Sequence, residues 1–244
     1  MKPRPNIYED ILIFRSGAAP RIGGHFAQPD LGLSYLLAAR HVIEAGEAER
    51  RLAEVALPVA YLQRHAMEIV MKDLLAIVYG LHADRTWLDA LMRDPNADRP
   101  ALERTPREHH FEKLRGVVCR ALKKLGFDLP EEIAEMASKL ARADDSDPTR
   151  FRYLTRSNGK ESFPKLEVLP VVERQEELEA MFEKHLRFQG FDGPASERSL
   201  ATELAAVGGY LFQQITNIVP FGQTVISPSV ATKRLAQQVS KTTR

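Results

Sequence analysis

The chain has 244 residues, 44% of them hydrophobic and 27% charged, a composition that excludes a disordered or collagen-like protein. Its 34 basic and 33 acidic residues nearly cancel, so the overall charge does not predict binding to DNA or to an anionic membrane. The one cysteine, Cys119, can form no disulfide within the chain and lies in no zinc-binding pattern. We therefore expect a cytoplasmic protein.

Residues 1–29 are rich in proline and glycine, which predicts an irregular N-terminal segment. The first ten residues include two prolines and two acids, so no signal peptide is expected. A first helix is predicted over 31–52. A second is predicted from Pro58, because the first turn of a helix does not need the N–H that proline lacks. Apolar residues between Leu62 and Leu81 recur three and four apart, as in an amphipathic helix.

Later residues predict further helices. Thr105-Pro-Arg-Glu108 has the pattern of a capping box and predicts a helix that runs to Leu125 and is ended by Gly126. Other helices are predicted over 131–143, 172–188 and 197–218. The expected fold is all-α: an antiparallel bundle of four to five helices within residues 30–219, with extra helices at the ends.

Residues 150–164 are predicted to form a small β-hairpin inserted into this bundle, with Asn158-Gly159 as its turn. Cations and aromatic rings alternate in this segment, which suits a surface where bases stack and phosphates bind. The arginines could equally pair with the acidic residues of 144–147. The nucleic-acid-binding candidates are Arg150, Arg152, Tyr153, Arg156 and Lys160.

No charged residue occurs between Leu204 and Thr232, a stretch long enough to cross a bilayer. It contains several glutamines, an asparagine and a proline, which are costly in lipid, so we expect no membrane span. The pattern favours a helix buried against both its own core and a partner, hence a homo-oligomer or a complex. Residues 220–244 form a C-terminal tail that ends in basic residues.

Two groups of polar residues are candidate sites. His65, Glu68 and Lys72 are three and four residues apart and share one helix face. They are either an ordinary polar pair or a polar cleft in which a histidine beside a carboxylate positions a proton, as in a small-molecule enzyme. His109 and His110 are adjacent, so their side chains diverge by about 100° on a helix. No metal-binding spacing surrounds them, and neither metal nor cofactor is predicted.

Three motifs follow one another in the chain. The stretch from Leu62 to Leu75 has alternating leucines with an inward Glu68 and Lys72. It is followed by His110-Phe-Glu-Lys-Leu114 and by the segment 147–159. In this order they resemble the HEPN family of helical bundles, some bacterial members of which carry a similar insertion. The resemblance covers residues 55–190. It implies a non-catalytic or weakly catalytic protein that assembles with a partner protein of the same operon, and with RNA, in a bacterial defence or toxin-type system.

The alternative implied by the resemblance is a metal-independent endoribonuclease that acts as a homodimer. Catalytic members of the family carry an arginine and a histidine separated by four to six residues, usually late in the bundle. The late helices here lack that pair, and the nearest spacings join Arg104 to His109 and to His110. These three residues are therefore the catalytic candidates, with a histidine as base and the arginine stabilising phosphorane charge.

Overall fold

The computed structural model describes residues 31–144, 147, 150–151, 161–163, 168–187, 194 and 197–218. All regular secondary structure in these ranges is helical, with no strand, so the prediction of an all-α chain is confirmed there. The helices are α1 (Leu31–Ala48), α2 (Leu52–Leu91), α3 (Phe111–Leu125), α4 (Glu131–Asp144), α5 (Val171–Met181), the π-helix η2 (Phe182–Leu186) and α6 (Leu200–Ile218).

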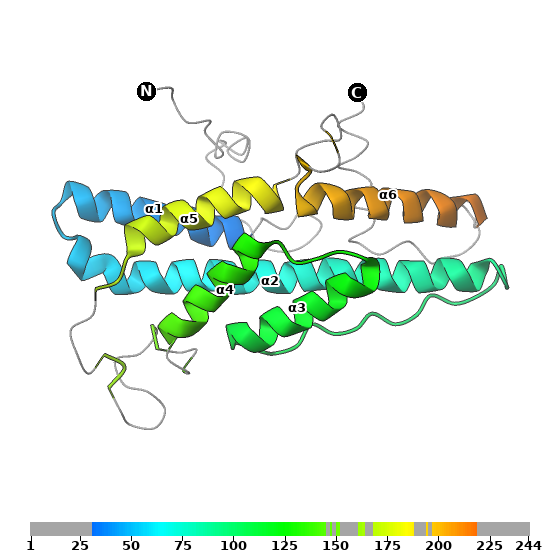
Figure 1. Ribbon diagram of the computed structural model, residues 1–244, viewed down its shortest axis with the longest axis horizontal. Coiled ribbons are helices and arrows are strands. Elements are labelled where there is room, and N and C mark those ends of the chain that lie inside the picture. Colours follow the sequence, from blue (N-terminus) through cyan, green and yellow to red (C-terminus); the bar gives the residue numbers. More distant parts are fainter. Residues whose placement is uncertain are drawn as a thin grey trace, which may run out of the picture.

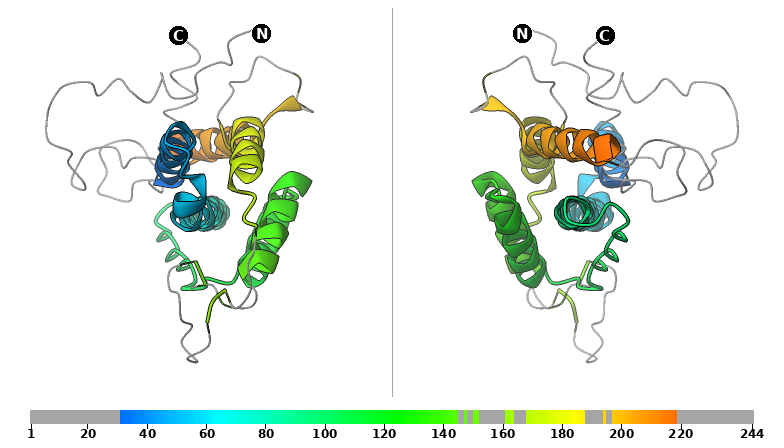
Figure 2. Two further views of the ribbon diagram at one scale, coloured as in Figure 1. Left: turned by 90° about the vertical axis from the view of Figure 1, so that its left-hand side faces the viewer. Right: turned by 90° about the vertical axis from the view of Figure 1, so that its right-hand side faces the viewer.

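Helix α2 is the axis around which the other helices are arranged. Its 40 residues make it about 60 Å long at a rise of about 1.5 Å per residue. Helices α1, α5 and α6 lie along one side of it, and α3 and α4 lie on the other (Figure 1). The end-on views show α1, α5 and α6 above α2, and the green helices to one side of it, reaching up toward α5 (Figure 2). Since α1 and α6 cover opposite ends of α2, the long helix has packing partners along its whole length.

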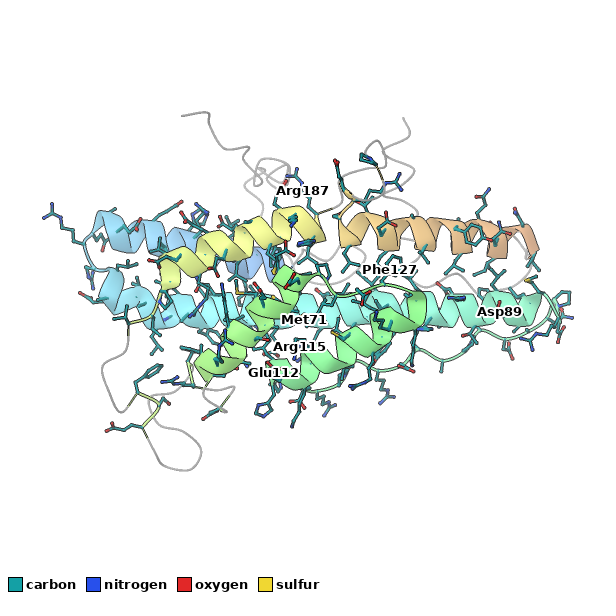
Figure 3. The ribbon with its side chains drawn as sticks, in the orientation of Figure 1. Met71, Asp89, Glu112, Arg115, Phe127 and Arg187 are labelled. Carbon is teal, nitrogen blue, oxygen red and sulfur yellow. The ribbon has the colours of Figure 1, made fainter. Side chains whose placement is uncertain are left out.

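The main hydrophobic core lies where α2 meets the other helices. Met71, in the middle of α2, is completely buried there (Figure 3). Removal of this apolar surface from water is the main force that holds the helices together. Every α-helix contributes to this core, through side chains that include Leu36, Met71, Leu114, Leu140, Leu178 and Leu211.

The α1–α2 connection is tight because a glycine removes a side chain at the crossing. A Cβ on Gly46 would lie 2.7 Å from Val55 Cγ2, closer than two carbons can approach. The chain then reverses through Arg50, whose φ of 58° is left-handed. The Arg51 N–H donates to the Gly46 carbonyl at 2.7 Å and closes the turn. Helices α1 and α2 therefore pack as an antiparallel pair.

A buried polar seam fixes α5 against α1 and α2. Gln63 Nε2 donates to the Val171 carbonyl at 2.6 Å. Gln175 Nε2 donates to the Leu36 carbonyl at 2.9 Å and to Glu179 Oε1 at 2.8 Å. Buried amides of this kind are stable only when hydrogen-bonded, so the seam specifies the position of α5.

Two helix ends are explained by local chemistry. Gly126 ends α3 with a φ of 87°, as predicted. The Phe127 N–H donates to the Leu122 carbonyl, and the Gly126 N–H to that of Lys123, which is the Schellman pattern. At the start of α6, the Ser199 hydroxyl accepts the Thr202 N–H at 3.1 Å and caps the helix.

Two predicted helix starts are wrong. Helix α2 begins at Leu52 and includes Pro58. Because Pro58 is exposed, water can hydrate the Glu54 carbonyl that loses its helical partner. Helix α3 begins at Phe111 rather than at Thr105. The Glu108 carboxylate accepts the N–H groups of the two residues before α3, so it orders the approach to the helix and not its first turn.

The remaining fold predictions fall mostly on residues that the structure does not describe. Of the predicted hairpin it describes only 150–151 and 161–163, and these contain no strand. The predicted irregular segment 1–29 and the tail 220–244 lie outside the described residues. Among the helices that are described, none combines the length and the apolar character needed to span a bilayer.

Candidate functional site

A buried cluster of charged side chains joins α2 to the end of α4 and the start of α3. Arg64 of α2 is 1% exposed. It donates through Nε and Nη2 to the two oxygens of Asp144 at 2.8 and 3.0 Å. Its Nη1 donates to Glu68 Oε2 at 2.8 Å, and Nη2 also donates to the His109 carbonyl at 2.8 Å. The planar guanidinium, with its fork of five donors, is suited to bridging three elements at once.

Arg64 also packs against the first residue of α3. Its guanidinium carbon lies 5.0 Å from the centre of the Phe111 ring. The positive charge therefore meets the negative face of the ring in a site closed to water, which adds a cation–π contribution to the hydrogen bonds. One side chain thus ties α2, α3 and α4 together.

Glu68 is the second buried group of the cluster, at 2% exposure. Its Oε1 accepts from Lys72 Nζ at 2.8 Å and lies 2.7 Å from His109 Nδ1. Burial opposes ionisation of Glu68, but the bonds from Lys72, Arg64 and His109 outweigh it and lower its pKa to about 2. Glu68 is therefore a carboxylate at neutral pH, and both of its oxygens are bonded.

The cluster is balanced in charge. Burial raises the pKa of Asp144, while the bonds and the charge of Arg64 act against this rise. Burial opposes the charge of Arg64, but the hydrogen bonds and charge of Asp144 and then Glu68 raise the pKa of its guanidinium. Two carboxylates, Asp144 and Glu68, face the two cations Arg64 and Lys72. A paired and hydrogen-bonded group of this kind can be buried, whereas either partner alone cannot.

Residues 92–110, called here the 92–110 strap, run back along α2 before α3 begins (Figure 1). Trp87 Nε1 donates to the Ala97 carbonyl at 2.8 Å. Further along, Arg99 Nε donates to the buried carboxylate of Asp84 at 2.7 Å. Successive strap residues thus contact successively earlier residues of α2, and the strap ends at the buried cluster.

His109 is where the cluster reaches solvent, because 53% of its side chain is exposed. Ionised Glu68 can only accept a hydrogen bond, so Nδ1 of His109 carries the hydrogen of this bond and Nε2 faces away from Glu68. Lys72 bonds to the same carboxylate oxygen and places an ammonium beside the imidazole. This arrangement can accept a proton and can stabilise a developing negative charge.

The predicted site residues are distributed differently from the prediction. His109, Glu68 and Lys72, which belonged to two separate candidate sites, are in contact. Arg104 is exposed on the strap and makes no ion pair with any residue that the structure describes. His110 precedes α3, and its N–H donates to Glu108 Oε1 at 3.0 Å. The structure therefore does not join Arg104 to either histidine by a contact.

His65 is separated from Glu68 and Lys72. Its ring stacks on Tyr61, with centroids 5.6 Å apart, and meets the edge of Tyr35 of α1 at 4.6 Å. Residues four apart form one row along a helix, so Arg64 and not His65 completes the row with Glu68 and Lys72. The predicted polar cleft therefore loses its histidine from α2 and gains His109 from the strap.

Arg150, a predicted nucleic-acid ligand, is buried at 6% exposure. Its Nε donates to the Ser162 carbonyl at 3.0 Å and its Nη1 to the Ala143 carbonyl at 2.8 Å. Its guanidinium carbon also lies 4.7 Å from the centre of the Phe163 ring. Arg150 therefore secures the chain after α4 and does not present its charge to a ligand. The other predicted ligands, Arg152, Tyr153, Arg156 and Lys160, lie outside the described residues.

Sequence reasoning missed Arg64 and Asp144. A signal for Arg64 exists, since Arg64, Glu68 and Lys72 alternate in charge at a spacing of four within an apolar helix. Asp144 has no such signal, because it lies 80 residues from Arg64 in the chain and only the fold brings the two together.

No group of three or more His, Cys, Asp or Glu side chains is placed to hold a metal ion in the part of the chain that the structure describes. Comparison of the chain with family models, with curated proteins and with solved structures finds no match.

Proposed function

We propose that the chain is a HEPN-like protein, with its helices in the antiparallel bundle of that family, which assembles with copies of itself or a partner protein and with RNA. On this proposal it works in a bacterial defence or toxin-type system and has no strong catalytic activity of its own. The resemblance of the motifs between residues 55 and 190 supplies the family and the system. The observation that supports assembly is the exposed, uncharged outer face of α6.

Helix α6 has an exposed face without charge. Tyr210, Gln213 and Asn217 recur three and four residues apart and are all exposed, Tyr210 to 61%. After Glu203 the helix contains no charged residue. Cores of protein interfaces are depleted in charge and enriched in tyrosine, so this face is suited to bury itself against another protein.

The residues around Tyr210 favour a second copy of the chain as the partner. The small, partly exposed residues Ala206 and Gly209 lie beside it and would let another helix approach closely. In a two-fold dimer the same face would meet itself, and an uncharged face can do so without repulsion between like charges. A helix rich in exposed lysine or arginine would not have this property.

The buried cluster supports the non-catalytic part of the proposal. Arg64 and Asp144 are enclosed, and both oxygens of Glu68 are bonded, so these groups serve the packing of α2, α3 and α4. Arg104, the arginine that the ribonuclease alternative needs, makes no ion pair with the described residues around it.

Light scattering of the purified chain tests the assembly. We expect a mass of more than one chain, and a monomer when Tyr210→Glu places a charge on the α6 face. Val168→Glu is the matched control, because Val168 is an exposed apolar residue outside α6, and it should leave the mass unchanged. A monomeric wild type at tens of micromolar would refute self-association, as would a Tyr210→Glu variant that keeps the wild-type mass.

A second function is favoured by one specific observation, the contact between His109 Nδ1 and Glu68. We propose as the alternative a metal-independent endoribonuclease in which Nε2 of His109 takes the proton from a ribose 2′-hydroxyl. The 2′ oxygen then attacks the adjacent phosphorus, and the 5′ oxygen of the next nucleotide leaves and takes a proton from water. The ammonium of Lys72 would then stabilise the charge that develops on the phosphate. This alternative predicts cleavage of single-stranded RNA that persists in EDTA.

A further inference from the structure

We infer that the 92–110 strap and the outer side of α3 bind the phosphate backbone of single-stranded RNA. The inference rests on the RNA part of the proposed function and locates a surface for it. None of the cations involved belongs to the predicted hairpin at 150–164. The proposed contact through α6 does not depend on it.

Positive charge is concentrated in this part of the chain. Residues 101–125 contain seven lysines and arginines and three acidic residues, whereas the formal net charge of the whole chain is only +1. The acidic residues are largely occupied by neighbours. Glu108 accepts two backbone N–H groups at 3.0 Å, and Glu112 pairs with Arg115 on α3 at 2.7 Å (Figure 3).

Several cations of this surface, in contrast, have no acidic partner. Arg104 and Arg107 of the strap and Arg120 and Lys124 of α3 are exposed. None of the four makes an ion pair with a residue in the described part of the chain. Exposed cations without partners keep their full attraction for an anion, since no internal pair has to be broken on binding.

Charged side chains of the strap and of α3 act on two titratable side chains of α2. Burial lowers the pKa of His82 on α2, and the positive charges of Lys124 and Arg85 lower it further. Glu103 of the strap and Arg120 of α3 both act on the half-buried Tyr79 of α2. Helix α3 packs directly on α2, so its exposed cations lie close to α2 and to the strap.

The shape of this surface favours a linear polyanion. Arg120 and Lys124 are one turn apart on α3, and Arg104 and Arg107 follow one another on a non-helical segment. The charges are thus arranged in rows and not around a single point, as a chain of phosphates requires. The strap leads to the exposed ring of His109, so RNA bound here would pass that histidine.

Fluorescence anisotropy with labelled oligouridine tests the inference. We expect the wild type to bind with an affinity that falls steeply between about 50 and 200 mM salt, with a slope of about −3 in log K against log salt for four phosphate contacts. The double variant Arg120→Glu and Lys124→Glu should weaken binding at low salt at least about tenfold and reduce the slope by about 1.4. Thermal unfolding should be nearly unchanged, since both residues are exposed.

The control is Lys139→Glu with Lys184→Glu, which makes the same change in net charge on α4 and η2 at two lysines that already pair with Glu177 and Glu132. It should bind RNA nearly as tightly as the wild type. If both double variants bind equally well, the assignment to α3 and the strap is wrong, although the RNA part of the proposed function stands. If the wild type binds no RNA at low salt, the assignment of this surface and the RNA part of the proposed function are both wrong. If polyglutamate at equal charge displaces the RNA as well as unlabelled oligouridine does, the surface recognises acidic protein instead.

Discussion

Replacement of Arg64 by methionine should destabilise the protein strongly. Methionine keeps the apolar stem of arginine and removes its charge, so Asp144 and Glu68 remain buried at 3% and 2% exposure without their shared partner. Loss of one partner from a buried ion pair costs about 3–5 kcal/mol. Such a loss is a large share of the stability of a typical domain. We expect the midpoint of urea unfolding to fall accordingly, with a similar dependence on denaturant.

The control for this prediction is Arg51→Met. Arg51 is also an arginine with two acidic neighbours, Glu49 and Glu54, but its side chain is 58% exposed, so its loss should cost far less than the loss of Arg64. Addition of Asp144→Leu to Arg64→Met should restore part of the stability, because a buried ion pair can be replaced by apolar groups. If Arg64→Met costs no more than Arg51→Met, the cluster does not hold the helices together and our reasoning is refuted.

Four other variants test three single features. Glu68→Gln should lower the free energy of unfolding by about 3 kcal/mol more at pH 7 than at pH 2. Ionised Glu68 stabilises the fold above its ordinary pKa of 4.5, and this stabilisation is lost as the pH falls toward its pKa of about 2 in the folded protein. A loss of unfolding free energy that is the same at both pH values would contradict this. Gly126→Ala should destabilise the protein by about 1 kcal/mol, because Gly126 has a φ of 87°. Gly116→Ala, inside α3, should instead raise stability by up to about 1 kcal/mol. If both variants shift the melting temperature in the same direction, this prediction is wrong. Ser199→Ala should remove about 1 kcal/mol by uncapping α6, and an unchanged thermal midpoint would rule the cap out.

The helices were predictable from sequence where a long repeat of apolar residues marks a buried face, as between Leu62 and Leu81 of α2. Their ends were less predictable, because an end is decided by what surrounds it. Pro58 is accepted inside α2 because it is exposed there. The capping pattern at Thr105 is not used, because the strap is held along α2 by Asp84 and by the buried cluster. Gly126 was predictable, since its left-handed backbone depends on the glycine alone.

The candidate site was predictable only in part, for a similar reason. Glu68 and Lys72 lie one turn apart, and this local spacing is visible in the sequence. The partners that give the site its properties come from elsewhere: Asp144 lies 80 residues from Arg64, and His109 lies 41 residues from Glu68. Contacts across such separations depend on how α3 and α4 pack on α2, which no local pattern encodes.

The central claim, that the chain assembles without strong catalysis of its own, is tested most directly by incubating the purified protein with labelled single-stranded RNA in EDTA. We predict that the RNA stays intact over hours, with wild type and with His109→Ala alike. EDTA-resistant cleavage that falls about 10²–10⁴-fold in His109→Ala, the loss expected for a general base, and that persists in His110→Ala would contradict the claim. It would assign the exposed histidine bonded to Glu68 to catalysis.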